Sequence, residues 1–344
     1  MVTMGPDGTT SFVQVGRRDL LLGGAAVLAG LGMGSRPARH RQAVTMPRNL
    51  TQYHQVLETL RELGQVAAPQ SVLPMVAGHA HTLRMLAKET RGRDALDVAM
   101  LSARTAEFAG WMAQEAGDDG AAAWWAGRAV QVAAAAGDRH TAAYSQVRRA
   151  LVTMYQGDAE ATVEFARRAQ ADPGTHPRIL GLAAQREAQG HALAGDHTAC
   201  LRALDRAAHY LSVAGNSPSQ GPVIGTSHVS DPVSVVTGWC LYDLGRPQEA
   251  AELLDREVLG IPATAVRMRT RFGVRQALAH SAAGDLDRAC DLAQSMVQQA
   301  STLGSATILT DLARLATSLR RWNSHTAVRA LEPAFGEALY RGAY

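Results

Sequence analysis

From residue 49 to the end of the chain, apolar residues recur at the spacing of amphipathic helices, and the helical runs are separated by turns of one kind. Each turn contains a glycine, which in all but one case is followed by aspartate. The turns are Gly117-Asp118, Gly157-Asp158, Gly195-Asp196, Gly245-Arg246 and Gly284-Asp285. They are separated by 40, 38, 50 and 39 residues. Such a recurring interval is typical of an array of helical repeats.

The residues of these turns are those that join two antiparallel helices. Glycine adopts the left-handed conformation that ends a helix, and aspartate accepts a hydrogen bond from the free amides that begin the next one. Small side chains let two helices approach closely. Alanines follow the turns at helical spacing, namely Ala161, Ala166, Ala169, Ala250 and Ala251. The repeating unit is therefore predicted to be a helical hairpin.

Five hairpins are expected, followed by one or two closing helices in 305–340. The hairpins are 94–116 with 118–136, 139–156 with 158–171, 177–194 with 196–214, 232–244 with 247–259, and 263–283 with 285–303. A segment rich in Gly, Ser and Pro, 214–232, lengthens the third interval. It is interpreted either as a lid over a groove or as a long connection.

The first 48 residues differ from this array and are predicted to be an appendage to one repeat domain, 49–344. Residues 1–16 are polar and indicate a flexible leader. Arg17 and Arg18 precede an apolar, Gly/Ala-rich run that ends at Gly34, an order found in twin-arginine export signals. We favour the interpretation of 17–34 as a linker helix, with export as the alternative.

Composition narrows the class of protein. The chain of 344 residues is 47% hydrophobic, 5% aromatic and 19% charged, which excludes a disordered chain and indicates a core of small aliphatic side chains. The net charge of +3 is too small to attract a polyanion over the whole domain. Its cysteines, Cys200, Cys240 and Cys290, lie in apolar helical patterns and are predicted to be buried thiols.

The hairpins resemble tetratricopeptide repeats, which have small residues at helix contacts and a Gly-Asp or Gly-Asn turn. This resemblance implies an all-α fold, a right-handed superhelix of antiparallel helical hairpins (a tetratricopeptide-like solenoid). A second resemblance covers longer stretches of sequence, which are similar to the C-terminal region of actinobacterial Xre-type helix-turn-helix transcriptional regulators. These stretches are 107–118 (EFAGWMAQEAGD), 232–248 and 251–290. That resemblance implies a regulatory module that binds a partner.

The chain departs from this family before Arg17. A DNA-reading domain of about 60 residues would be expected there, whereas 16 residues are present, and no recognition helix can be fitted to them. We therefore expect no direct nucleic-acid binding by this chain.

The candidate ligand residues lie on the first helix of each hairpin, which in tetratricopeptide superhelices faces the concave groove. Arg267, Arg271 and Arg275 share one helix face, where their guanidinium groups could bind the carboxylates of a peptide. The other candidates are Arg148, Arg149, Gln185, Gln189 and Trp239. The alternative is a solvated face or local pairing with acids such as Asp255 and Glu257.

No catalytic, metal or cofactor motif is found. His79 and His81 are two residues apart and diverge on a helix, and the glycines of 30–34 lack the spacing and the lysine of a nucleotide loop. The expected function is a non-catalytic interaction module, with no cofactor, that binds a peptide, a protein segment or a small effector and is able to form a homodimer. We expect a cytoplasmic protein, with membrane contact only if 17–34 is an export signal. The alternative is an exported tetratricopeptide-repeat scaffold.

Overall fold

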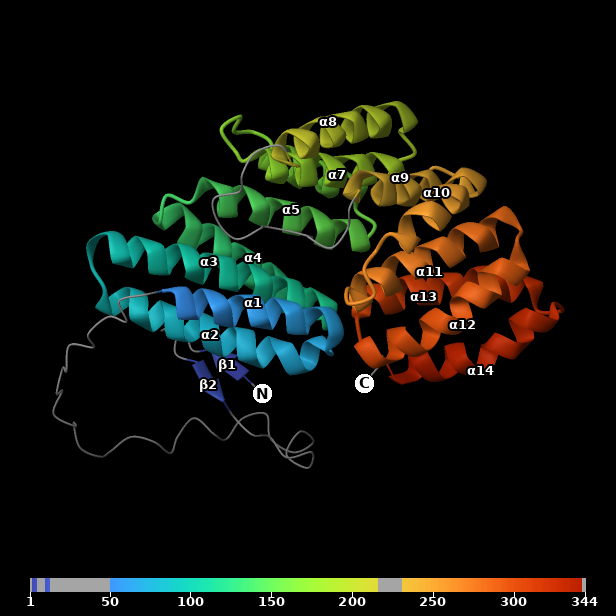
Figure 1. The fold of residues 1–344 in the computed structure, drawn as a ribbon, viewed down its shortest axis with the longest axis horizontal. Coiled ribbons are helices and arrows are strands. Elements are labelled where there is room, and N and C mark those ends of the chain that lie inside the picture. The colour runs from blue at the N-terminus through green and yellow to red at the C-terminus, as the bar shows by residue number, and fades with distance from the viewer. Residues whose placement is uncertain (1, 5–9, 13–49, 216–230, 342–344) are drawn as a thin grey trace.

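The computed structural model describes residues 2–4, 10–12, 50–215 and 231–341, and the part from residue 50 onward is helical (Figure 1). Two short strands, β1 (Val2–Met4) and β2 (Thr10–Phe12), pair antiparallel where a flexible leader was expected. The sequence between them, Gly5-Pro6-Asp7-Gly8, consists of turn-forming residues, a signal that the polar character of the segment obscured. The segment 17–34, with Arg17 and Arg18, and residues 216–230 of the insertion lie outside the described residues.

The described helices agree with the predicted hairpins and add two helices before them. They are α1 (Thr51–Val66), α2 (Pro69–Glu89), α3 (Gly92–Glu115), α4 (Asp119–Ala135), α5 (Arg139–Tyr155), α6 (Ala159–Ala169), α7 (Pro177–Leu193), α8 (His197–Gly215), α9 (Pro232–Asp243), α10 (Pro247–Leu259), α11 (Val266–Ala283), α12 (Leu286–Leu303), α13 (Ala306–Leu319), the short 3-10 helix η2 (Arg320–Trp322) and α14 (Thr326–Arg341).

The turns have the predicted chemistry. Gly117, Gly157 and the corresponding glycines of the other turns have positive φ, between 74° and 88°. Asp158 accepts a hydrogen bond from the amide of Ala161 at 2.9 Å, and the aspartates after Gly117, Gly195 and Gly284 accept in the same way. Local sequence therefore determines where each helix ends and the next begins.

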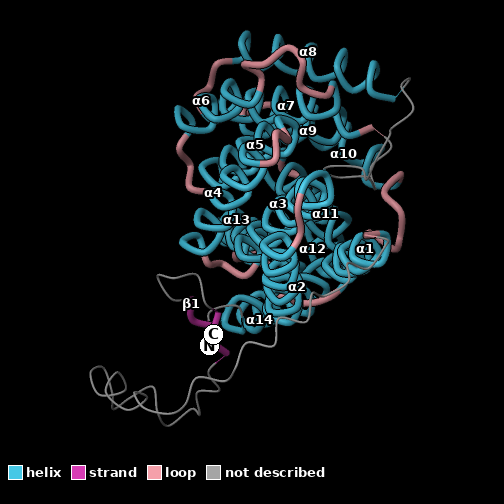
Figure 2. The backbone as a smooth tube through the Cα atoms, turned by 90° about the vertical axis from the view of Figure 1, so that its left-hand side faces the viewer, coloured by secondary structure: helices cyan, strands magenta, loops and turns pink. Residues whose placement is uncertain are grey.

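Consecutive helices pack against one another, and the odd-numbered helices from α3 to α13 also contact each other in sequence, which makes them the inner layer. Figures 1 and 2 show α8 and α14 at opposite ends of the molecule. The array does not stay open, because α11 contacts α1 and α13 contacts α3. The inner helices at the two ends of the array are therefore in contact with each other.

Glycine and alanine let the two layers approach closely. Of the predicted contact alanines, Ala166, Ala169, Ala250 and Ala251 are buried, whereas Ala161 is only partly buried. Gly238 on α9 has no room for a side chain, since a Cβ there would lie 2.7 Å from the Cγ atom of buried Leu254 on α10. Close contact between backbones compensates for the scarcity of aromatic residues in the core.

Candidate functional site

The predicted arginine stripe is present on α11, but it is buried inside the molecule. Arg267 and Arg275 are each 1% exposed and Arg271 is 8% exposed. Their partners are neither solvent nor the neighbouring acids Asp255 and Glu257, as the alternative interpretation proposed. They pair with three carboxylates that lie on other helices, those of Glu115, Asp311 and Asp243.

Glu115, at the last turn of α3, is the partner of Arg267 and Arg271. It is 0% exposed and also accepts hydrogen bonds from the hydroxyl groups of Ser305 and Thr307, at the start of α13. We call these five residues the closing cluster. It joins α3 to α11 and α13. The residues of α11 and α13 that contact Glu115 follow it by more than 150 positions in the chain.

Arg267 extends the closing cluster to α1. Its guanidinium donates to the backbone carbonyls of Gly64 at 2.7 Å and Ala67 at 2.6 Å, at the C-terminal end of α1. Cations are favourable at that end of a helix, where carbonyl groups lack helical partners. One arginine therefore connects the first and the eleventh helix.

The electrostatics of the closing cluster favour the charged form of Glu115. Burial raises the pKa of this carboxyl group, but Arg271 and Arg267, together with the hydroxyl donors of Ser305 and Thr307, outweigh burial and lower the pKa to about 2. Glu115 is thus ionised at neutral pH although it has no contact with solvent.

Arg275 is held by a second carboxylate. It forms a two-pronged ion pair with buried Asp311 on α13, at 2.8 and 2.7 Å, and its guanidinium lies 3.6 Å from the ring centre of Trp239. Arg267 and Arg275 therefore have structural partners that explain their positions, in contrast to the predicted role in ligand binding.

A central cavity of about 70 Å³ lies among α5, α7, α9 and α11. Five of the eight candidate ligand residues line it, namely Arg148, Gln185, Gln189, Trp239 and Arg271. The remaining lining residues are Tyr144, Val147, Leu151, Leu182, Arg186, Pro232, Val235, Val236, Met268 and Phe272. A cavity of this volume has room for several water molecules.

Two of the candidates are committed to contacts with the protein, and one lies elsewhere. Arg148 pairs with Glu107 of α3, and Gln185 donates to the carbonyl of Pro232 at 2.7 Å, which links α7 to α9. Arg149 is exposed and stacks on Phe165 of α6, 4.2 Å from the ring centre. Adjacent residues diverge on a helix, so Arg148 faces inward and Arg149 does not.

In the described part of the chain, two polar side chains in the wall of the central cavity lack a hydrogen-bond partner or a counter-charge. Gln189 is 0% exposed, and within the described residues neither its amide nitrogen nor its amide oxygen has a hydrogen-bond partner. Arg186 is half-buried, and in the same part of the chain it has no carboxylate partner. Desolvation lowers the pKa of this guanidinium to about 10. Such groups normally mark a site for water or a ligand.

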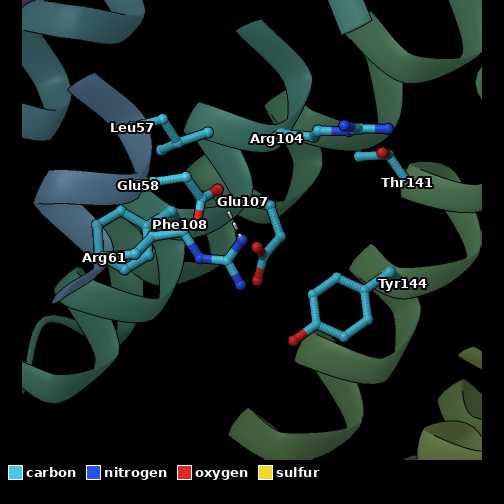
Figure 3. Close-up of a pocket in the computed structure, with 8 residues that line it drawn as sticks. All are labelled: Leu57, Glu58, Arg61, Arg104, Glu107, Phe108, Thr141 and Tyr144. Carbon is cyan, nitrogen blue, oxygen red and sulfur yellow. Dashed lines mark hydrogen bonds and ion pairs between the residues drawn. The ribbon is translucent and has the colours of Figure 1, made fainter. Parts of the chain in front are cut away.

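A smaller pocket lies beside the central cavity, between α1, α3 and α5, and shares Tyr144 with it (Figure 3). Figure 3 shows Arg61 joined to Glu58 on α1, with Tyr144 across the pocket on α5. Its charged lining residues are two glutamates and two arginines, so its charge is balanced. The described part of the wall of the central cavity contains three arginines and no acidic residue.

Sequence reasoning missed Glu115 and Arg186. Arg186 precedes Gln189 by three positions and so shares a helix face with a residue that was selected. Glu115 is a single acid at the end of an apolar run, 108–116, which is an unusual place for a carboxylate. Both signals were present in the sequence.

The described residues contain no group of three or more His, Cys, Asp or Glu side chains placed to hold a metal ion. Cys200, Cys240 and Cys290 are buried and free, as predicted. In the same part of the chain, no helix is both long enough and apolar enough to span a membrane. No protein-family model matches the chain, and no curated protein is significantly similar to it in sequence.

Proposed function

We propose that this chain is a non-catalytic sensor module that binds an effector in the central cavity. The observation that carries the proposal is the convergence of inward-facing polar side chains from several hairpins, including the unpartnered amide of Gln189 and the unpaired guanidinium of Arg186. Ligand sites are typically apolar cavities with a few placed polar groups, and the central cavity fits that description.

The sensor is proposed to be part of a transcriptional regulator, acting through a partner or through its own oligomeric state. The support for this step is the similarity of 107–118, 232–248 and 251–290 to the ligand-responsive region of Xre-type regulators. We also propose that the hairpins are of the tetratricopeptide type and wind as a right-handed superhelix. The support is the Gly-Asp turn chemistry. The interval of about 40 residues is longer than the roughly 34 residues of a tetratricopeptide repeat, so the proposed repeats are lengthened ones.

Arg271 connects the central cavity to the closing cluster. It lines the cavity, and its guanidinium also donates to Glu115 and to Thr307. A ligand that contacts Arg271 therefore changes the interactions that hold α3 against α11 and α13. A ligand with different affinities for the closed and a more open arrangement shifts the population between them, and this shift is the signal.

Native mass spectrometry of the full chain after incubation with fractionated small-molecule and peptide extracts tests the proposal. Wild-type protein is expected to retain a bound species. Gln189→Leu, which removes the unpartnered amide, is expected to lose it, and Gln298→Leu, the same change on the exposed face of α12, is expected to keep it. Absence of a bound species, or equal retention by both variants, refutes the proposal.

A second measurement addresses the signal. Analytical ultracentrifugation of the wild-type chain, with and without the bound species, is expected to show a change in sedimentation coefficient as the arrangement or the oligomeric state shifts. An unchanged coefficient, with the species bound, contradicts the sensor mechanism while leaving the binding site in place.

A further inference from the structure

The charges around the central cavity do not balance. Among the described residues, its wall contains Arg148, Arg186 and Arg271 and no Asp or Glu. Arg148 is neutralised by Glu107, whereas Arg271 shares the single carboxylate of Glu115 with Arg267. Arg186 pairs with no carboxylate among the described residues.

An unpaired guanidinium that has lost much of its hydration is unfavourable for the folded protein. A structural arginine in such a place would have acquired a carboxylate partner, as Arg267 and Arg275 have. Arg186 therefore has the properties of a binding residue, whose unfavourable environment is relieved only when an anion occupies the cavity. Proteins retain destabilising groups of this kind at functional sites.

The hydrogen-bonding groups nearby indicate the form of the anion. Gln189 lies three positions after Arg186 on α7 and offers an amide donor, and the Nε atom of Arg271 is buried and has no acceptor in the described part of the chain. A carboxylate accepts two parallel hydrogen bonds from a guanidinium and still has lone pairs for such donors. In the described wall Arg186 is the guanidinium that pairs with no carboxylate, so the site matches a single negative charge.

The rest of the wall is apolar and indicates what the anionic group is attached to. Val235, Val236 and Leu182 lie beside the aromatic rings of Trp239 and Phe272, whose centres are 6.2 Å apart. These surfaces favour an aliphatic or aromatic group of modest size. A cavity of about 70 Å³ is suited to a small molecule and has no room for a folded segment.

We propose that the effector is a small monocarboxylate with an apolar body, its carboxylate bound by Arg186 and Gln189 and its body packed against Trp239 and Phe272. This inference rests on the proposed function, since it names the ligand class of the same cavity. The recognising chemistry is a single negative charge at one end of an otherwise apolar molecule.

Thermal unfolding of the full chain with matched probes tests the ligand class. The probes are hexanoate and phenylacetate, compared with hexanamide and phenylacetamide, which have nearly the same shape and no charge, at millimolar concentration and constant ionic strength. Inorganic phosphate serves as an anion without an apolar body. The carboxylates are expected to raise the Tm of the wild-type chain, whereas the amides and phosphate leave it unchanged.

The variant Arg186→Met tests whether Arg186 binds a ligand or stabilises the fold. The variant keeps most of the side-chain length but removes the charge, so we expect its ligand-free Tm to rise above that of the wild type and its response to the carboxylates to vanish. Arg256→Met, the same change at an exposed position of α10, is expected to leave both quantities unchanged.

Each other outcome overturns the inference. Equal shifts with carboxylates and amides would mean a neutral ligand and leave the proposed function intact. Absence of a shift with any carboxylate, or a lower Tm for ligand-free Arg186→Met, would show that Arg186 does not serve a carboxylate. The proposed function itself fails if the extract experiment yields no bound species, or if Gln189→Leu and Gln298→Leu retain it equally.

Discussion

Glu115→Gln provides a direct test of how the closing cluster holds the array together. The substitution keeps the shape of the side chain but leaves Arg267 and Arg271 buried without their counter-charge. The pKa of Glu115 falls from its ordinary value of 4.5 to about 2 in the folded chain. This difference of about 2.5 corresponds to roughly 3 kcal/mol of stability at neutral pH. Removal of one partner of a buried ion pair costs about 3–5 kcal/mol in general, which agrees with this value.

The assay is urea unfolding followed by tryptophan fluorescence and circular dichroism, for the wild type and Glu115→Gln at a series of pH values. The folded pKa lies below the unfolded one, so the contribution of Glu115 is complete above pH 4.5 and is lost as the pH falls toward 2. The difference in unfolding free energy between the two proteins should therefore be about 3 kcal/mol at pH 7 and shrink progressively below pH 4.5.

The matched control is Glu164→Gln. Glu164 pairs with Arg168 on the surface of α6, where both side chains are more than half exposed. Its loss is expected to cost less than about 0.5 kcal/mol at any pH. The reasoning is refuted if Glu115→Gln is as mild as this control, or if its deficit is the same at pH 7 and pH 3. Small-angle scattering of Glu115→Gln adds a geometric readout, an increased radius of gyration as α3 separates from α13.

Three further predictions concern the packing, the turns and the N-terminal segment. Gly238→Ala is expected to destabilise the chain by about 1–3 kcal/mol, because the added methyl group meets Leu254 between two packed helices; a neutral result in urea unfolding would contradict this contact. Asp158→Ala is expected to lose about 1 kcal/mol through loss of the cap of α6, and Asp158→Asn, which retains an acceptor, should recover most of it. If 17–34 is a linker, changing Arg17 and Arg18 to lysine leaves the distribution of the chain between cytosol and exterior unchanged, as cell fractionation would show; loss of an exported form would instead support a twin-arginine signal.

The hairpins could be predicted from the sequence because their determinants are local. A glycine with positive φ and the aspartate after it act within a few residues, so reading the chain was enough to place the turns at Gly117 and Gly157. The strand pair at residues 2–4 and 10–12 was overlooked because the surrounding segment is polar and short.

The arrangement of the candidate site could be predicted only in part. Helical spacing indicated the faces of Arg148, Gln185, Gln189 and Arg271 that line the central cavity, since that depends on one helix at a time. Arg149, which was predicted to lie in the groove with Arg148, is exposed and faces away from the cavity. It could not reveal that Arg267 and Arg271 meet Glu115, because that contact depends on the closure of the whole array. The same closure replaces the predicted long groove with a cavity that is partly open to solvent.

Binding of an effector between α5, α7, α9 and α11 is tested most directly by a crystal structure of the full chain with the species retained in the extract experiment. Our account predicts ligand density inside the central cavity, with an anionic group against Arg186 and Gln189 and the remainder against Trp239. Density on an outer face of the even-numbered helices, with Gln189 still unpartnered, would contradict it.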